Sequence, residues 1–120
     1  MNVAVSVEGR PTGTVTFLFT DIEGSTALWE QHPAGMGVAL AQHDRLLKDV
    51  ISQGGGWVFS SGGDGFAAAF ASPLHAGRAA MHVQDAMSSA EWPDGLVLRV
   101  RIGLHTGTAE ERDGDRSEER

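Results

Sequence analysis

Two aspartates are the residues of this sequence whose type and position could most readily do chemistry. Asp21 follows residues 14–20, whose alternating β-branched and aromatic side chains predict a strand, and Asp64 follows a glycine-rich turn directly before another predicted strand. Carboxylate oxygens suit Mg²⁺ or Mn²⁺, and two apposed carboxylates repel each other unless a cation or a proton lies between them. An aspartate at a strand end is also a common turn former or helix cap, so both interpretations stand at this point.

The turn after Asp21 is a second feature that could take part in chemistry. A predicted helix begins near Ala27, and the residues that lead into it are Ile22, Glu23, Gly24, Ser25 and Thr26. A glycine-containing turn before a helix presents backbone N–H groups to a phosphate. Together with a pair of metal-binding carboxylates, this turn favours a nucleoside triphosphate bound through its polyphosphate.

The elements that must position these groups can be predicted from periodicity and from turn residues. Strands are expected over 14–20, 57–60, 65–71 and 96–106, and helices over 27–30, over 36–51 and from Pro73 to Met87, with Pro33 and Gly35 breaking the first helix from the second. This βααββαβ order predicts an α+β fold with a ferredoxin-like antiparallel sheet and helices on one face. The first and third strands are then antiparallel neighbours, which brings Asp21 beside Asp64.

Composition limits the remaining possibilities. The chain has 120 residues, enough for one domain, and its 9 basic and 16 acidic residues give a net charge of −7, which argues against nucleic-acid binding. The absence of cysteine excludes disulfides and thiolate metal sites, and no apolar run is long enough for a membrane span. Without a signal-peptide pattern, a cytoplasmic location is expected. We divide the chain into a lead-in (1–12), a domain (13–109) and a charged, solvated tail (110–120).

Three segments resemble the class III adenylate/guanylate cyclase catalytic domain. Residues 17–26 (FLFTDIEGST) resemble its opening motif, residues 60–66 (SSGGDGF) its second motif on a hairpin, and residues 101–107 (RIGLHTG) its third characteristic strand. The resemblance implies a two-metal cyclase that converts ATP or GTP to a 3′,5′-cyclic nucleotide and pyrophosphate in intracellular signalling. In that family two Mg²⁺ or Mn²⁺ ions are held by groups that match the Asp21 and Asp64 carboxylates and the Ile22 carbonyl, and the loop from Ile22 to Thr26 binds phosphates.

The same resemblance indicates two base-recognition positions. Many adenylate-specific members carry a lysine where this chain has Ser60, and Asp115 falls where the other base-reading acid is expected. The choice between ATP and GTP is therefore open.

The family pattern is incomplete at the carboxyl end of this chain. Members continue with a helix that carries an asparagine and an arginine for the transition state, whereas no asparagine follows Asn2 here. We expect a truncated domain that is weak or inactive alone, exposes apolar surface, and needs a homodimer or a heterodimer with a complete domain. Alternatives are a non-catalytic metal/nucleotide-binding or dimerising regulatory module, a diguanylate cyclase-like enzyme, and a plain structural domain.

Overall fold

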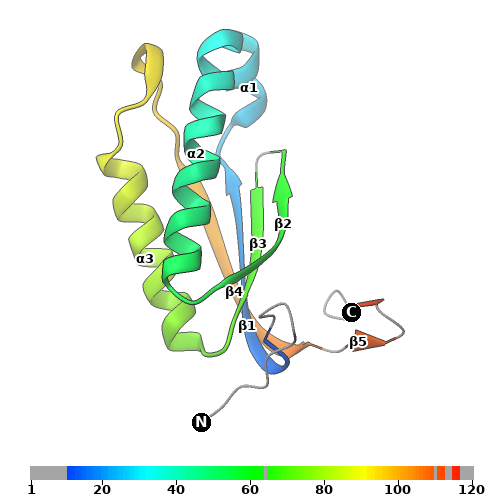
Figure 1. Ribbon diagram of the computed structural model, residues 1–120. Coiled ribbons are helices and arrows are strands. Elements are labelled where there is room, and N and C mark those ends of the chain that lie inside the picture. Colours follow the sequence, from blue (N-terminus) through cyan, green and yellow to red (C-terminus); the bar gives the residue numbers. More distant parts are fainter. Residues whose placement is uncertain (1–10, 64, 110, 113–114, 117–120) are drawn as a thin grey trace.

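The computed structural model describes residues 11–63, 65–109, 111–112 and 115–116. The elements follow in the order β1 (Gly13–Ile22), α1 (Ser25–Gln31), α2 (Pro33–Gln53), β2 (Trp57–Gly62), β3 (Gly65–Phe70), α3 (Pro73–Ser89), a 3₁₀ turn η1 (Pro93–Gly95) and β4 (Val100–Ala109). Two short strands, β5 (Glu111–Arg112) and β6 (Asp115–Arg116), pair with each other. The main sheet has the antiparallel order β2-β3-β1-β4 (Figure 1), which confirms the predicted ferredoxin-like α+β fold.

Strand β1 is the centre of the sheet and has two different faces. Leu18 and Ile22 point into the main core beneath the helices, whereas Val15 and Phe17 belong to a small cluster on the other face. Because side chains alternate along a strand, Asp21 shares the helix-free face with Phe17 and Phe19. This alternation decides on which side of the sheet the chemistry lies.

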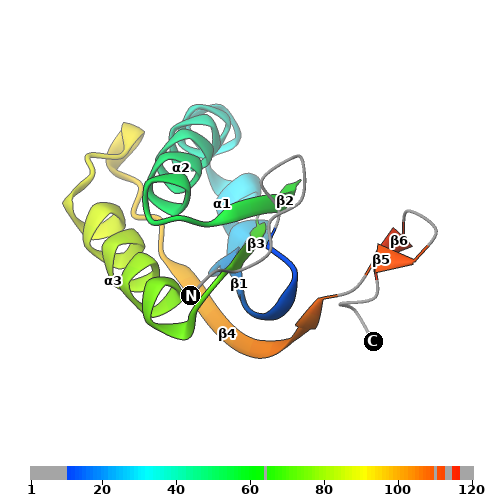
Figure 2. The ribbon, with the colours of Figure 1, turned by 60° about the horizontal axis from the view of Figure 1, so that its bottom comes forward.

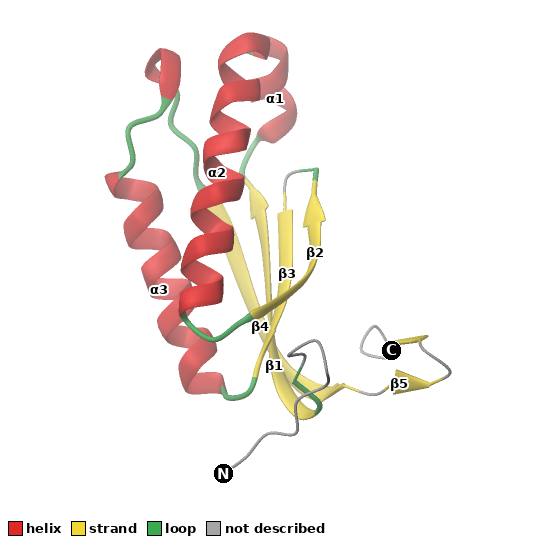
Figure 3. Ribbon diagram, in the orientation of Figure 1, coloured by secondary structure: helices red, strands yellow, loops and turns green. Residues whose placement is uncertain are grey.

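Helices α2 and α3 cover one face of the sheet, and none of the helices in the described part of the chain lies on the opposite face (Figures 2 and 3). We expected Pro33 to interrupt the helical region, but Pro33 itself is helical. It is the first residue of α2, where its fixed φ suits a helix and its missing N–H costs nothing. The break falls one residue earlier, at His32, whose backbone is not helical. Helix α3 begins in the same way, with Pro73 after the capping residue Ser72, whose hydroxyl accepts a hydrogen bond from the His75 N–H.

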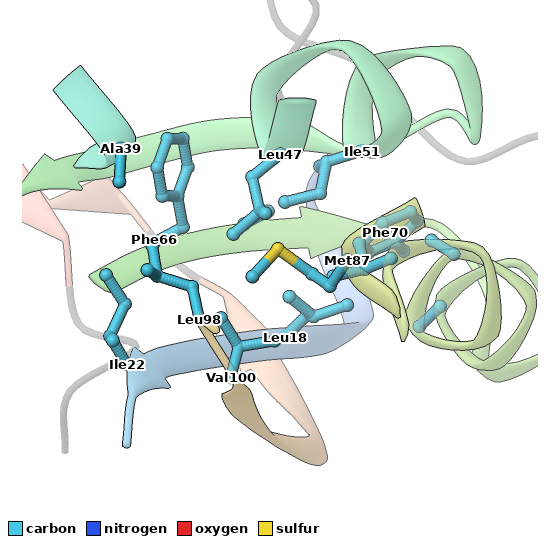
Figure 4. Close-up of a cluster of buried hydrophobic side chains, with 14 of the residues drawn as sticks. Leu18, Ile22, Ala39, Leu47, Ile51, Phe66, Phe70, Met87, Leu98 and Val100 are labelled. Atoms are coloured by element: carbon cyan, nitrogen blue, oxygen red, sulfur yellow. The ribbon is translucent and has the colours of Figure 1, made fainter. Parts of the chain in front are cut away.

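The core lies between the two helices and the sheet (Figure 4). Its helical members recur every three or four residues, and its strand members alternate, so one apolar stripe meets one apolar face. Phe66 and Phe70 of β3 lie between Leu47 and Ile51 of α2 on one side and Met87 of α3 on the other. This packing fixes β3 against β1 and so positions the hairpin next to Asp21.

The last strand differs from our prediction at its start. We expected it over 96–106, but β4 begins at Val100 and continues to Ala109. Leu96 and Leu98 are buried and alternate as a strand would, yet they have no ladder partner. The ladder ends at the pair of Ile22 and Val100, and beyond it a backbone hydrogen bond from the Glu23 N–H to the Arg99 carbonyl joins the two segments before β1 gives way to the turn at Gly24.

None of the described helices combines the length and the apolarity needed to cross a membrane.

Candidate functional site

Asp21 lies at the carboxyl end of β1, where two neighbouring strands meet it. Its register partners are Gly65 at the start of β3 and Arg101 near the start of β4. Any side chain at position 65 would collide with the Thr20 carbonyl oxygen, so glycine is what allows the β2–β3 hairpin to approach β1 this closely. The buried Thr20 hydroxyl accepts a hydrogen bond of 3.1 Å from the Phe66 N–H, which ties the hairpin base to β1. The hairpin tip is thereby held beside the Asp21 carboxylate.

The Asp21 carboxylate forms an ion pair with an arginine in this structure. The Arg101 Nε and one terminal nitrogen donate to the two carboxylate oxygens at 2.9 and 2.8 Å, a two-pronged ion pair across the β1–β4 ladder. The hydrogen bond from Arg101, assisted by its charge, lowers the pKa of Asp21 below its ordinary value. Both side chains are partly exposed, 46% for Asp21 and 63% for Arg101, so water and ions reach the pair.

A shallow hollow of about 300 Å³ surrounds this carboxylate. Its walls are short stretches of β1 and β4, formed by Phe19, Thr20, Asp21, Arg101, Ile102 and Gly103. A Cβ at Gly103, which pairs with Phe19, would meet no atom within 4 Å, so the hollow is open at this point of its wall. The hollow is a place where a small charged ligand can approach Asp21 and Arg101 together.

A larger hollow of about 540 Å³ lies elsewhere, between the carboxyl half of α3 and residues 96–100. Glu23 and Arg99 reach its rim, but Asp21 and Arg101 are not among its walls. We therefore place the candidate site at the smaller hollow, since that one contains the paired carboxylate and guanidinium.

The loop after Asp21 turns sharply away from the sheet. Gly24 adopts the left-handed conformation, with φ of 63°, which glycine reaches without steric cost. Its carbonyl accepts the first helical hydrogen bond, from the Leu28 N–H at 3.1 Å. The Glu23 N–H is not available to a ligand, because it donates to the Arg99 carbonyl at 2.8 Å. Of the predicted phosphate loop, Glu23, Gly24 and Thr26 are exposed, Ser25 is half-buried and Ile22 is buried.

The structure brings some of the predicted site residues together and leaves others undescribed. Asp21, Ile22 and the loop to Thr26 are contiguous, and the hairpin reaches them at Gly65. Asp64 lies outside the described residues, and so does the side chain of Asp115. Ser60 lies on exposed β2, opposite Ala67, which in turn pairs with Phe19. This register places Ser60 on the same face of the sheet as Asp21.

Arg101 is the functional residue that sequence reasoning missed. It stands in the third motif, but we assigned it no role, because only the β1–β4 register shows that it faces Asp21. Within the described part of the chain, no cluster of three or more histidines and acidic residues that could hold a metal ion occurs.

Comparison with known proteins identifies the family of this chain. The sequence model of the adenylate and guanylate cyclase catalytic domain matches residues 7–115. The uncharacterized protein Rv0891c of Mycobacterium tuberculosis is 39% identical over 86% of this chain and 34% of its own length. An adenylate cyclase of Lachancea kluyveri is 33% identical over 81% of this chain and 6% of its own length.

A solved structure shows the same fold. An adenylate cyclase of Trypanosoma brucei, crystallised in its monomeric state, superposes with a TM-score of 0.80 at 27% identity. The match covers 88% of this chain and 63% of the trypanosomal chain. This chain therefore spans about a third of the length of the mycobacterial relative and under two thirds of the length of the trypanosomal chain. By its sequence motifs and its fold, this chain belongs to the adenylate and guanylate cyclase catalytic domain family.

Proposed function

We propose that this chain supplies the metal- and phosphate-binding half of a nucleotide cyclase site, which turns ATP or GTP into a 3′,5′-cyclic nucleotide and pyrophosphate. The observation that carries the proposal is the Asp21 carboxylate at the end of β1, in an open hollow beside the Gly65 hairpin. Family membership supplies the reaction class.

The oxygen donors at this end of the sheet suit two Mg²⁺ or Mn²⁺ ions. Asp21 and Asp64 would hold them with carboxylate oxygens and Ile22 with its backbone carbonyl, which are the hard ligands these ions prefer. Asp21 lines an open hollow of about 300 Å³, from which such ions could approach it. When bound, such ions lower the pKa of the ribose 3′-hydroxyl and offset charge on the phosphates.

Two parts of the chain next to Asp21 favour an anionic ligand. The turn at Gly24, which leads into α1, could offer backbone amides to phosphate oxygens. Arg101 lines the hollow beside Asp21, and guanidinium groups match phosphates with paired hydrogen bonds. The polyphosphate would then lie between the loop and β4, with its α-phosphate close to Asp21.

The base and the transition state depend on further residues. Ser60 shares the sheet face with Asp21 and is a candidate contact of the purine, together with Asp115. No asparagine follows Asn2, so the asparagine of complete family members has no counterpart in these 120 residues, and a complete cyclase domain could supply it together with its arginine. Removing such a transition-state contact costs on the order of 10² to 10³ in rate. The chain alone is therefore expected to be weakly active or inactive.

Complementation tests this proposal. The chain is mixed with a complete cyclase domain whose own metal-binding aspartates are replaced but whose asparagine and arginine are intact. Cyclic AMP and cyclic GMP are then measured by mass spectrometry with Mn²⁺ and a mixture of ATP and GTP. We expect product with the wild-type chain and with the control Asp49→Ala, at an exposed residue of α2. With Asp21→Ala the rate of product formation should fall at least about 100-fold.

Two results would count against the proposal in different ways. Equal product with wild type and Asp21→Ala would remove Asp21 from the site. Nucleotide binding to the mixture without any product would favour a non-catalytic metal/nucleotide-binding module that regulates its partner.

A further inference from the structure

Two threonines of β1 keep polar side chains in an otherwise apolar surface. Thr16 and Thr20 are 2% and 7% exposed, and they share the helix-covered face of the sheet with the core residues Leu18 and Ile22. Burying a hydroxyl is costly unless a hydrogen bond compensates for the lost contact with water. The Thr16 hydroxyl has such a bond, of 3.0 Å, with the Thr106 hydroxyl of β4. The Thr20 hydroxyl bonds to β3 instead, so the two threonines tie β1 to different neighbours.

Thr20 reaches β3 at the place where that strand begins. Its hydroxyl accepts a hydrogen bond of 3.1 Å from the Phe66 N–H, one residue after Gly65, which pairs with Asp21. Residues 61–65 include three glycines, so few side chains are available to hold this end of the hairpin by packing. Phe66 is the first large residue of β3, and its ring is buried in the core (Figure 4). The buried ring and the bond to Thr20 together fix where β3 starts.

The bond to Thr20 links the core to the candidate site. Neighbouring residues of a strand point to opposite faces, so the Thr20 side chain faces the core while Asp21 faces the helix-free side. We propose that Thr20 is a positioning residue that acts through β3: its hydroxyl holds the start of β3 against β1 and so sets where the hairpin lies relative to the Asp21 carboxylate. This inference rests on the proposed function, in which Asp21 and Asp64, the residue before Gly65, hold the metal ions.

Calorimetric titration of the full chain with Mn²⁺ and a non-hydrolysable ATP or GTP analogue together tests this role. Thr20→Val keeps the branched shape and removes the acceptor. It should weaken the binding about tenfold, because the apparent affinity falls with the fraction of molecules whose hairpin is in place. Thr20→Ser keeps the hydroxyl and should bind like the wild type. Thr16→Val removes a similarly buried hydroxyl from the same strand and should also bind like the wild type.

Amide hydrogen exchange, measured by NMR without ligand, tests the contact itself. The Phe66 N–H should exchange about tenfold faster in Thr20→Val than in the wild type, since a bond that protects it is gone. Thr16→Val should leave this exchange rate unchanged. Circular dichroism and urea unfolding of the two valine variants separate a local shift of β3 from a general loss of stability.

A second substitution displaces the same backbone by another route. The Cβ of Gly65→Ala collides with the Thr20 carbonyl, so this variant should weaken the binding as Thr20→Val does. Gly77→Ala in α3, where a Cβ meets no atom within 4 Å, should bind like the wild type. This pair of variants tests the same displacement if Thr20→Val does not fold.

The outcomes separate this inference from the proposed function. It is overturned alone if Thr20→Val binds like the wild type while Asp21→Ala binds weakly, or if Thr16→Val weakens the binding as much as Thr20→Val. It is also overturned if Thr20→Ser binds as weakly as Thr20→Val. Binding that neither Asp21→Ala nor Thr20→Val changes would overturn the proposed function as well, since the ligand would then not use this end of β1.

Discussion

The Asp21–Arg101 pair sets the conditions under which a cation can bind at the end of β1. Arg101 engages both carboxylate oxygens of Asp21 at 2.8 to 2.9 Å. A divalent ion needs the same lone pairs, so it must displace the guanidinium or share one oxygen with it. The freed guanidinium then faces the hollow as a positive group. A metal ion that arrives with a polyphosphate can meet the Asp21 carboxylate and the Arg101 guanidinium together.

The ion pair predicts a pH dependence of stability. A carboxyl whose pKa is lower in the folded chain than in the unfolded chain stabilises the fold above its unfolded pKa, and this contribution disappears as the pH falls through the folded-state pKa. Arg101 lowers the pKa of Asp21 from its ordinary value of 3.8. Wild type should therefore melt slightly above Asp21→Asn at pH 7, and the difference should shrink below about pH 4.

Thermal denaturation followed by circular dichroism measures this difference. The effect is small, because the pair is exposed and screened by salt. The variant Asp49→Asn, at an exposed aspartate of α2, serves as the control. A wild-type advantage that grows as the pH falls would have the wrong sign for this account.

Gly65 permits a second prediction at the scale of one residue. Gly65→Ala should destabilise the chain by about 1 to 3 kcal/mol, as overpacking does elsewhere, because its Cβ collides with the Thr20 carbonyl. Gly77→Ala in α3 is the matched control. A Cβ there meets no atom within 4 Å, so it should stabilise by about 0.5 to 1 kcal/mol. Urea unfolding measures both, and equal effects of the two substitutions would contradict the close strand approach.

At the scale of elements, helix α2 carries a polar group in its apolar stripe. His43 is fully buried, and its ring lies edge-on to Phe66 with centroids 5.8 Å apart. The Nδ1–H donates to the Asp44 carboxylate at 2.8 Å, which leaves Nε2 as a bare acceptor. Among the described residues this nitrogen has no hydrogen-bond partner. An unsatisfied buried acceptor costs about 1 to 3 kcal/mol.

His43→Leu should for this reason stabilise the chain, by about 1 kcal/mol after the loss of the Asp44 bond. His43→Ala should instead destabilise it, because it leaves a cavity beside Phe66. The urea midpoints of the two variants give the comparison. A destabilised His43→Leu would show that Nε2 has a partner, such as an ordered water.

Most elements could be predicted from periodicity, because helix and strand periods are local properties. The spacing of apolar residues in α2 and α3, and the alternation in β1, indicated the elements that the structure contains. The ends of an element were harder to predict where they depend on a neighbouring strand. Residues 96–99 alternate like a strand, but the ladder between β1 and β4 ends at Ile22 and Val100. No pattern within residues 96–99 indicates this end.

The candidate site could be predicted in part for the same reason. Asp21 and its loop are consecutive in the sequence, and the βααββαβ order was enough to bring the hairpin toward them. The ion pair with Arg101 depends on the register of β1 against β4, which a single sequence does not specify. The metal-binding role of Asp21 and of the undescribed Asp64 remains a prediction.

At the scale of the whole molecule, the sheet separates stability from chemistry. The helix-covered face holds the main core, while the helix-free face carries Asp21 and a smaller aromatic cluster. In that cluster the Phe17 ring stacks on His105 with centroids 6.4 Å apart and meets Phe59 edge-on at 6.1 Å. These contacts tie β2, β1 and β4 together where no helix does. Substitutions near Asp21 can consequently be made without entering the main core.

Binding of a nucleotide together with a metal ion tests the central claim most directly. The chain is titrated calorimetrically with Mn²⁺ and a non-hydrolysable ATP or GTP analogue, each alone and both together. We predict that the pair binds to the wild type and to Asp49→Ala, and that Asp21→Ala weakens this binding at least about tenfold. Equal affinity for the wild type and Asp21→Ala would contradict the assignment of a metal- and phosphate-binding half-site to this end of β1.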